Sequence, residues 1–168
     1  MRKALNALYD CAAALAALFM VGLLAMVLTS ILGRQLHFNV PGVDAYAGYM
    51  MASAGFLALA HTLKKGEHIR VTLVLNALGA GQRRWMERWA TGAGAALALL
   101  FAVFSVRLVL QSHEFNDMST SNDATPLWIP QLAMAAGAVV FAIAAIDEFV
   151  LAWHGRAPRA DGEMLRHE

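Results

Sequence analysis

The chain has 168 residues, of which 59% are hydrophobic and 15% are charged, and its formal net charge is +1. This charged fraction is well below that of an ordinary soluble domain, so much of the surface must face an apolar environment. A net charge near zero, without a basic run interleaved with aromatic residues, argues against a nucleic-acid partner. The single cysteine, Cys11, has no partner in the chain for a disulfide.

The first long apolar run follows Arg2 and Lys3. Residues 11–33 carry no charge, and at about 1.5 Å per residue such a helix crosses the roughly 30 Å hydrocarbon core of a bilayer. The apolar region of a secretory signal is only about 7–15 residues long. We therefore predict a retained membrane span rather than a cleaved signal.

Three further apolar runs meet the same criterion of length. Prolines stand near the ends of the runs and not at their centres, so the helices should be continuous. The prediction is an all-α integral membrane protein with four transmembrane helices in a single membrane domain, residues 1–168. The predicted spans are about 8–33, 44–63, 88–110 and 127–152.

Lysine and arginine are concentrated on one side of these spans, which indicates their orientation because cytoplasmic loops carry the excess of basic residues. Only Arg34 and Arg107 fall on the opposite side. We predict that both termini are cytoplasmic, including the tail 154–168. The basic residues on the cytoplasmic side are Arg2, Lys3, Lys64, Lys65, Arg70, Arg83, Arg84, Arg88, Arg156, Arg159 and Arg166.

The loop between the second and third spans contains apolar residues at helical spacing, including Val71, Val74 and Leu78. We predict a short amphipathic helix at about 70–79 that lies along the membrane surface; a solvated turn is the alternative. Two arginines and two tryptophans, each pair four residues apart, then stand where the third span begins. These predicted interfacial anchors are Arg84, Trp85, Arg88 and Trp89.

No predicted span carries an ionisable residue near its centre, where such residues mark ion, proton or substrate pathways. No two histidines fall at matching depth inside the membrane, as axial ligands of a haem would have to. Neither metal-ligand spacing nor a pairing of a nucleophile with a base is present. We predict a protein that is not an enzyme and has no catalytic residue, no cofactor and no metal site.

Small residues recur at helical spacing in three of the predicted spans. They allow two helix backbones to approach closely, either within this chain or against a second membrane protein, and the residues alone leave both alternatives open. The candidate packing or subunit-interface residues are Gly48, Ala52 and Gly55 in the second span, Gly92 and Ala96 in the third, and Ala133 and Gly137 in the fourth.

Two short motifs flank the spans: residues 61–71 read HTLKKGEHIRV, and residues 125–131 read TPLWIPQ. With the four-span layout, they resemble the small permease subunit, of the DctQ type, of tripartite ATP-independent periplasmic (TRAP) transporters. The resemblance covers roughly residues 5–150, judged on span order and loop lengths. Its motif positions are Gly66, Glu67, His68, Ile69, Arg70, Val71, Pro126, Trp128 and Pro130.

The chain departs from the family pattern at two positions. Asp44 stands alone where the family often has an aromatic residue and a pair of glutamates, and Thr72 stands where an aspartate is common. The resemblance therefore transfers no role to these two positions.

The resemblance implies a heteromeric transport complex in the bacterial inner membrane. In that family a large multi-span permease subunit holds the substrate and sodium sites, and a soluble periplasmic solute-binding protein delivers the solute. The small subunit is implied to be a stationary, non-catalytic scaffold that is embedded in the lipid bilayer. The implied activity of the complex is sodium symport of an organic acid.

Two other classes of protein have the same number of spans. A self-sufficient four-helix transporter requires a carboxylate within the membrane for which proton and cation compete. A membrane anchor subunit of a redox complex requires haem ligands on facing helices. The spans contain neither feature, so we place both classes behind the scaffold subunit.

Overall fold

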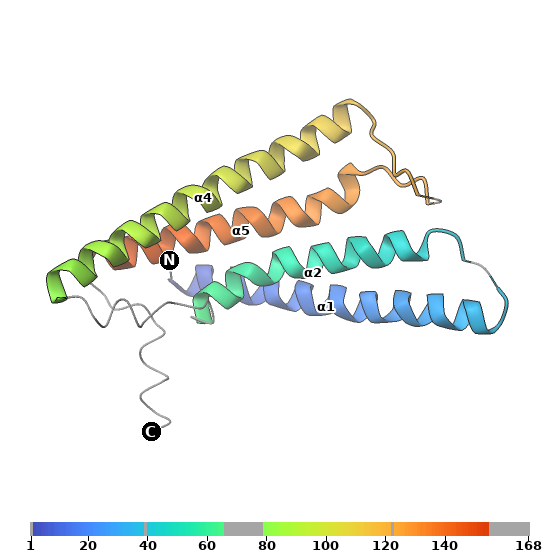
Figure 1. Ribbon diagram of the computed structural model, residues 1–168, viewed down its shortest axis with the longest axis horizontal. Coiled ribbons are helices and arrows are strands. Elements are labelled where there is room, and N and C mark those ends of the chain that lie inside the picture. The colour runs from blue at the N-terminus through green and yellow to red at the C-terminus, as the bar shows by residue number, and fades with distance from the viewer. Residues whose placement is uncertain (1, 39, 66–78, 122, 155–168) are drawn as a thin grey trace, which may run out of the picture.

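Four long helices make up most of the described part of the chain (Figure 1). The computed structural model describes residues 2–38, 40–65, 79–121 and 123–154. Within these residues no strand is present, and the one β-type pairing is an isolated bridge between Met118 and Pro126. The all-α prediction is thus confirmed. The helices are α1 (Arg2–Gln35), α2 (Val43–Lys65), α4 (Ala80–Glu114) and α5 (Trp128–Trp153).

Two predicted segments fall wholly or mostly outside the described residues. The amphipathic helix expected at 70–79 overlaps the described part of the chain only at Gly79, which precedes α4. The predicted cytoplasmic tail, 154–168, overlaps it only at His154. Both therefore stay predictions.

The helices form an open row and not a closed bundle, in the order α1, α2, α5, α4 (Figure 1). Helix α1 packs against α2, α2 packs against α5, and α5 packs against α4, whereas α1 meets α5 only slightly. The contact between α2 and α5 therefore joins two antiparallel hairpins, α1–α2 and α4–α5. It is the main connection between the two halves of the described chain.

The distribution of side chains is the reverse of that in a soluble protein. Most of the buried apolar residues are alanines, and Ala138 is 0% exposed, whereas large side chains such as Leu18 (65%) and Leu97 (68%) are exposed. Small side chains let neighbouring helix backbones approach closely. Contiguous large apolar surfaces are rare on soluble monomers, so the outer surface of the row fits lipid or other membrane helices.

Helices α1, α4 and α5 are long and apolar enough to cross a membrane, and α2 is not among them. Helix α2 contains Tyr46, Tyr49 and Ser53 within its apolar stretch and ends on Lys64 and Lys65, all of which lower its mean hydropathy. Three of the four predicted spans are thus supported as candidate membrane helices. The remaining predicted span, 44–63, corresponds to α2, which is a helix of 23 residues.

Helix α4 begins at Ala80, not at Arg88 as the predicted span does. Its 35 residues correspond to about 52 Å, which exceeds the roughly 30 Å hydrocarbon core. The predicted anchors Arg84 and Trp85 consequently lie inside the helix and do not precede it.

The connections 36–42 and 115–127, which the structure describes except at residues 39 and 122, lie together at one end of the row, called here the loop end (Figure 1). The opposite end, where α1 begins, α2 ends, α4 begins and α5 ends, is called the basic end, because Lys64 and Lys65 of α2 and Arg83, Arg84 and Arg88 of α4 lie there.

Candidate functional site

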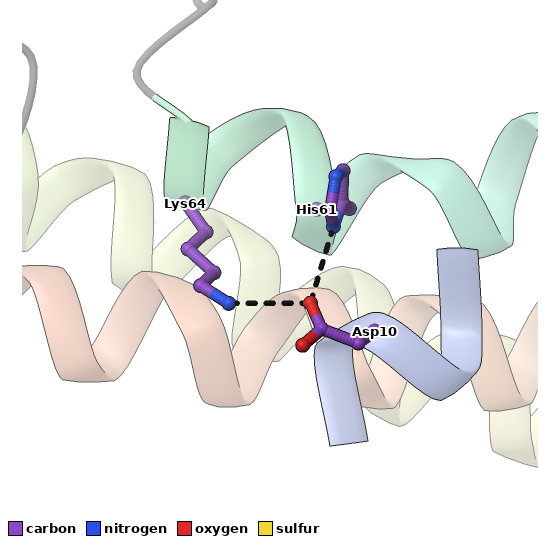
Figure 2. A network of polar contacts seen from close by, with 3 residues as sticks. All are labelled: Asp10, His61 and Lys64. Atoms are coloured by element: carbon purple, nitrogen blue, oxygen red, sulfur yellow. Dashed lines mark hydrogen bonds and ion pairs between the residues drawn. The ribbon is translucent and has the colours of Figure 1, made fainter. Parts of the chain in front are cut away.

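A polar cluster joins α1 to α2 near the basic end. Figure 2 shows the Asp10 side chain of α1 directed toward His61 and Lys64 of α2. Asp10 Oδ1 lies 3.3 Å from Lys64 Nζ and 3.8 Å from His61 Nδ1. The Lys64 ammonium also lies over the Tyr9 ring, 5.8 Å from its centroid. One carboxylate thus faces two basic groups from the neighbouring helix.

The groups in this cluster are suited to holding α1 against α2. Asp10 is 61% exposed, and an exposed ion pair contributes only about 0–1 kcal/mol. His61 Nδ1 has no hydrogen-bond partner among the described residues. No group of three or more His, Cys, Asp or Glu side chains capable of holding a metal occurs in the described part of the chain. The cluster therefore offers a link between helices and no evident metal centre.

A second polar cluster attaches the 115–127 connection to the first turns of α2 at the loop end. The Tyr49 hydroxyl donates a hydrogen bond to Asp123 Oδ2 (3.0 Å), and the Ser119 hydroxyl donates to Asp123 Oδ1 (2.7 Å). Tyr46 and Thr125 share a further hydroxyl contact of 3.1 Å. Gly42 has φ +82°, and a Cβ there would lie 2.7 Å from Asp123 Cβ. The two connections therefore touch, and glycine is required at their contact.

The Asp123 carboxylate is held in its ionised form by this cluster. Hydrogen bonds from Thr125, Ser119 and Tyr49, with that of Thr125 the largest, lower the pKa of Asp123 below its ordinary value, and burial opposes them only in part. Because the folded protein favours the charged form, the stabilisation is fully present above the ordinary carboxyl pKa of about 4. It is lost as the pH falls through the lowered pKa.

We predict that Tyr49→Phe, which removes one donor to Asp123, destabilises the loop end at neutral pH and much less in acid. Thermal unfolding of the purified chain in detergent, from about pH 7 down to about pH 3, measures this. The variant should unfold below the wild type at neutral pH, and the difference should shrink in acid. Tyr9→Phe is the matched control, because the Tyr9 hydroxyl belongs to α1 near the basic end and has no hydrogen-bond partner among the described residues. If Tyr49→Phe lowered the unfolding temperature by the same amount at all pH values, the prediction would be contradicted.

The interiors of the helices contain few polar groups. The buried polar side chains of the described residues are Ser53, Ser105 and Ser112. Ser53 donates its hydroxyl hydrogen to the backbone carbonyl of Tyr49, 2.7 Å away. Three hydroxyl groups on separate turns provide no carboxylate to exchange a proton or bind a cation.

The predicted small-residue positions differ in their surroundings. A Cβ on Gly137 would lie 2.5 Å from the backbone carbonyl carbon of Phe56, and one on Gly92 would lie 3.0 Å from the Phe149 ring. Ala133 is half-buried. By contrast, four positions are exposed: Gly48, Ala52, Gly55 and Ala96. No atom lies within 4 Å of a Cβ built on Gly48 or on Gly55. Gly137 and Gly92 thus pack within the chain, whereas the four exposed positions face outward.

An apolar groove runs between α1 and α2 beside the exposed Gly55. Its volume is about 400 Å³, and small side chains dominate its lining. The lining residues are Ala13, Ala16, Ala17, Met20, Ala54, Gly55, Ala58, His61 and Thr62. The groove therefore extends from the middle of the hairpin to the polar cluster at the basic end.

The predicted interfacial anchors all lie in the first turns of α4. Trp85 and Trp89 are largely exposed, at 68% and 65%. Arg88 donates to the backbone carbonyl of Trp153 (3.4 Å) and lies 5.5 Å from the centroid of the Trp153 ring, so it also ties α4 to α5. The role of these residues at a membrane surface stays a prediction.

Of the motif positions, Gly66 to Val71 lie outside the described residues. Pro126 takes part in the bridge with Met118, and Trp128 packs edge-on against His113, with ring centroids 5.3 Å apart. Pro130 stands in the first turn of α5, where backbone N–H groups have no partner within the helix, so proline costs no hydrogen bond there. This motif therefore shapes the start of α5 and its contact with the end of α4.

Sequence reasoning did not identify the two polar clusters. Asp10 stands near the start of the first predicted span and His61 near the end of the second, and these two ends fall on the same side of the membrane. That is the signal from which their contact could have been inferred. The second cluster left a weaker signal in Tyr46 and Tyr49, three residues apart at the start of a span, and in a loop rich in Ser, Thr and Asp.

Comparisons with known proteins agree on one family. Residues 23–155 match the family described as tripartite ATP-independent periplasmic transporters, DctQ component. The C4-dicarboxylate TRAP transporter small permease protein DctQ of Rhodobacter capsulatus is 29% identical over 114 residues, which cover 62% of this chain and 49% of that protein. The chain thus matches about half the length of this curated relative. No solved structure matches.

Proposed function

Since the chain belongs to the DctQ family of tripartite ATP-independent periplasmic transporter components, we propose that it is the small scaffold subunit of a sodium-driven uptake system for an organic acid. Family membership makes it a component of a transporter and not an enzyme. With three long apolar helices, it is a membrane protein. What we propose beyond family membership is the scaffold role, sodium as the driving ion and the partner subunits.

The observation that carries the scaffold role is the chemistry of the helix interiors. Their buried polar groups among the described residues are three serine hydroxyls. A site for a carboxylate and a coupling sodium ion needs cationic or N–H donors for the anion and several oxygen ligands for the cation. The four described helices are continuous and bury no such set, so we assign the solute and ion sites to a partner.

We further propose that α2 also crosses the membrane, so that α1, α2, α4 and α5 all span it, with both termini in the cytoplasm of a bacterial inner membrane. Helix α2 lies between α1 and α5 in the row and runs alongside both, and α1 and α5 are apolar enough to cross. The basic residues of α2 and α4 cluster at one end of the row, and Arg34 stands at the other, which favours a cytoplasmic basic end.

The proposed partners are a large multi-span permease subunit and a soluble periplasmic solute-binding protein. The open row supports the first partner, because no described residue covers its apolar faces or the groove beside Gly55. The matched relative is named for C4-dicarboxylates. A C4-dicarboxylate is therefore the first substrate class to test.

Deleting this chain while retaining the large permease and the binding protein is predicted to abolish uptake. The measurement is sodium-dependent accumulation of a radiolabelled C4-dicarboxylate in whole cells, with other organic acids tested in parallel. Re-expression of the chain should restore uptake. The level of the large permease in the membrane is measured at the same time, because a scaffold is expected to support its assembly. Wild-type uptake after deletion would overturn the proposal.

A further inference from the structure

The loop end contains a cavity that the proposed scaffold role does not explain. It lies between the last turns of α1, the 36–42 connection with the first turn of α2, and Ser121 of the 115–127 connection, and its volume is about 420 Å³. This is within the range of about 300–1,000 Å³ that is usual for small-molecule sites. Polar side chains from all three segments line it, among them Ser30, Arg34, Asp44 and Ser121.

The cavity carries charges of both signs that form no direct ion pair with each other. The Ser30 hydroxyl donates to Asp44 Oδ1 (3.0 Å) and accepts from Arg34 Nη2 (3.4 Å), so it stands between the carboxylate and the guanidinium. Neither Arg34 nor Asp44 forms an ion pair with another described residue. Arg34 therefore retains free donors, and Asp44 retains free acceptor positions. Such a lining suits a ligand that bears both an anion and an ammonium group.

The position of the cavity along α1 indicates where this ligand comes from. Arg34 stands in the last turn of a helix that is apolar enough to cross a membrane. Leu28, Ile31 and Leu32, in the turns just before it, are exposed. If α1 crosses the bilayer as proposed, these leucine and isoleucine side chains contact acyl chains, and Arg34 lies at head-group depth.

We propose that this cavity binds the head group of a phospholipid with a primary ammonium, of the phosphatidylethanolamine type. Arg34, with the nearby His37 imidazole, would hold the phosphate, and the Asp44 carboxylate would hold the ammonium. A primary ammonium has three N–H donors for a carboxylate, whereas the quaternary ammonium of phosphatidylcholine has none. Phosphatidylglycerol presents a phosphate but leaves Asp44 without a cation.

The test is binding of short-chain phospholipids to the purified chain in a neutral detergent, measured by native mass spectrometry and by thermal shift. Phosphatidylethanolamine should bind about tenfold more tightly than phosphatidylcholine or phosphatidylglycerol. Arg34→Gln and Asp44→Asn should each remove most of this preference, since each loses a charged hydrogen bond to the head group. Arg34→Lys, which keeps the charge, should retain part of it.

The matched controls are Arg107→Gln on α4 and Asp117→Asn in the 115–127 connection, because both residues lie toward the loop end but do not line the cavity. Equal binding of the three lipids, or equal losses in the control variants, would overturn the inference. Binding of soluble phosphoethanolamine as tightly as the lipid would also overturn it, by assigning the site to a soluble ligand. The assay uses the isolated chain, so its outcome is separate from that of the uptake experiment.

Discussion

Replacing Gly137 by leucine should separate the two halves of this protein. A Cβ at this position would lie 2.5 Å from the carbonyl carbon and 2.7 Å from the carbonyl oxygen of Phe56, and 2.8 Å from the backbone nitrogen of Leu57. These are backbone atoms in the middle of α2, which cannot move aside as a flexible side chain does. The contact of α2 with α5 is the main connection between the hairpins. We expect a loss of about 3 kcal/mol or more.

Thermal unfolding and size-exclusion chromatography in detergent measure the effect of Gly137→Leu. Gly94→Leu is the matched control, because a Cβ on Gly94 of α4 has nothing within 4 Å. That substitution should be neutral or stabilise the helix by up to about 1 kcal/mol, as glycine is a poor helix former. Gly137→Ala should already destabilise, since the Cβ alone is too close to Phe56. Equal unfolding temperatures for the leucine variants at 94 and 137 would contradict this packing.

Replacing Gly55 by leucine should leave the stability of the chain unchanged but weaken its complex with the large permease subunit. Gly55 is exposed, no atom lies within 4 Å of a Cβ built there, and it lines the apolar groove between α1 and α2. The leucine side chain would fill space that we propose a helix of the large permease occupies. Overpacking of a close interface costs about 1–3 kcal/mol, which corresponds to roughly a fivefold to 150-fold loss of affinity.

The measurement is the amount of large permease that co-purifies with the tagged variant from membranes, alongside unfolding of the variant alone. Gly94→Leu again serves as control, because it places the same side chain on another exposed helix surface, away from the groove. The expected result is reduced co-purification for Gly55→Leu alone. If both variants retain the permease equally, this groove is not the interface.

The row of helices could not be derived from the sequence. Helices α1 and α4 expose large apolar side chains on many turns, including Leu24, Leu28, Leu97 and Leu100. A helix that is apolar on all sides has no single stripe to indicate which face packs, unlike an amphipathic helix of a soluble protein. Lipid and protein interior are similarly apolar, so hydrophobicity does not distinguish an inner from an outer face.

Both polar clusters depend on contacts between distant parts of the chain. Asp10 and Lys64 are separated by 54 positions, and Tyr49 and Asp123 by 74. The order of the spans determines which helix ends lie together, so the start of the first span, with Asp10, and the end of the second, with His61, fall on one side of the membrane. Span order does not pair the two side chains, since the rotation of each helix about its axis decides which side chains meet.

The sequence by itself determined the helices, the scarcity of polar groups at their centres and the resemblance to the family. These follow from the length and composition of contiguous segments, because a membrane helix satisfies its backbone hydrogen bonds within its own segment. Only the tertiary structure decided that Gly137 packs against the backbone of α2 while Gly55 faces outward. Both are glycines in apolar helices, and their roles differ because the close packing of α2 against α5 sets the rotation of each helix in the row.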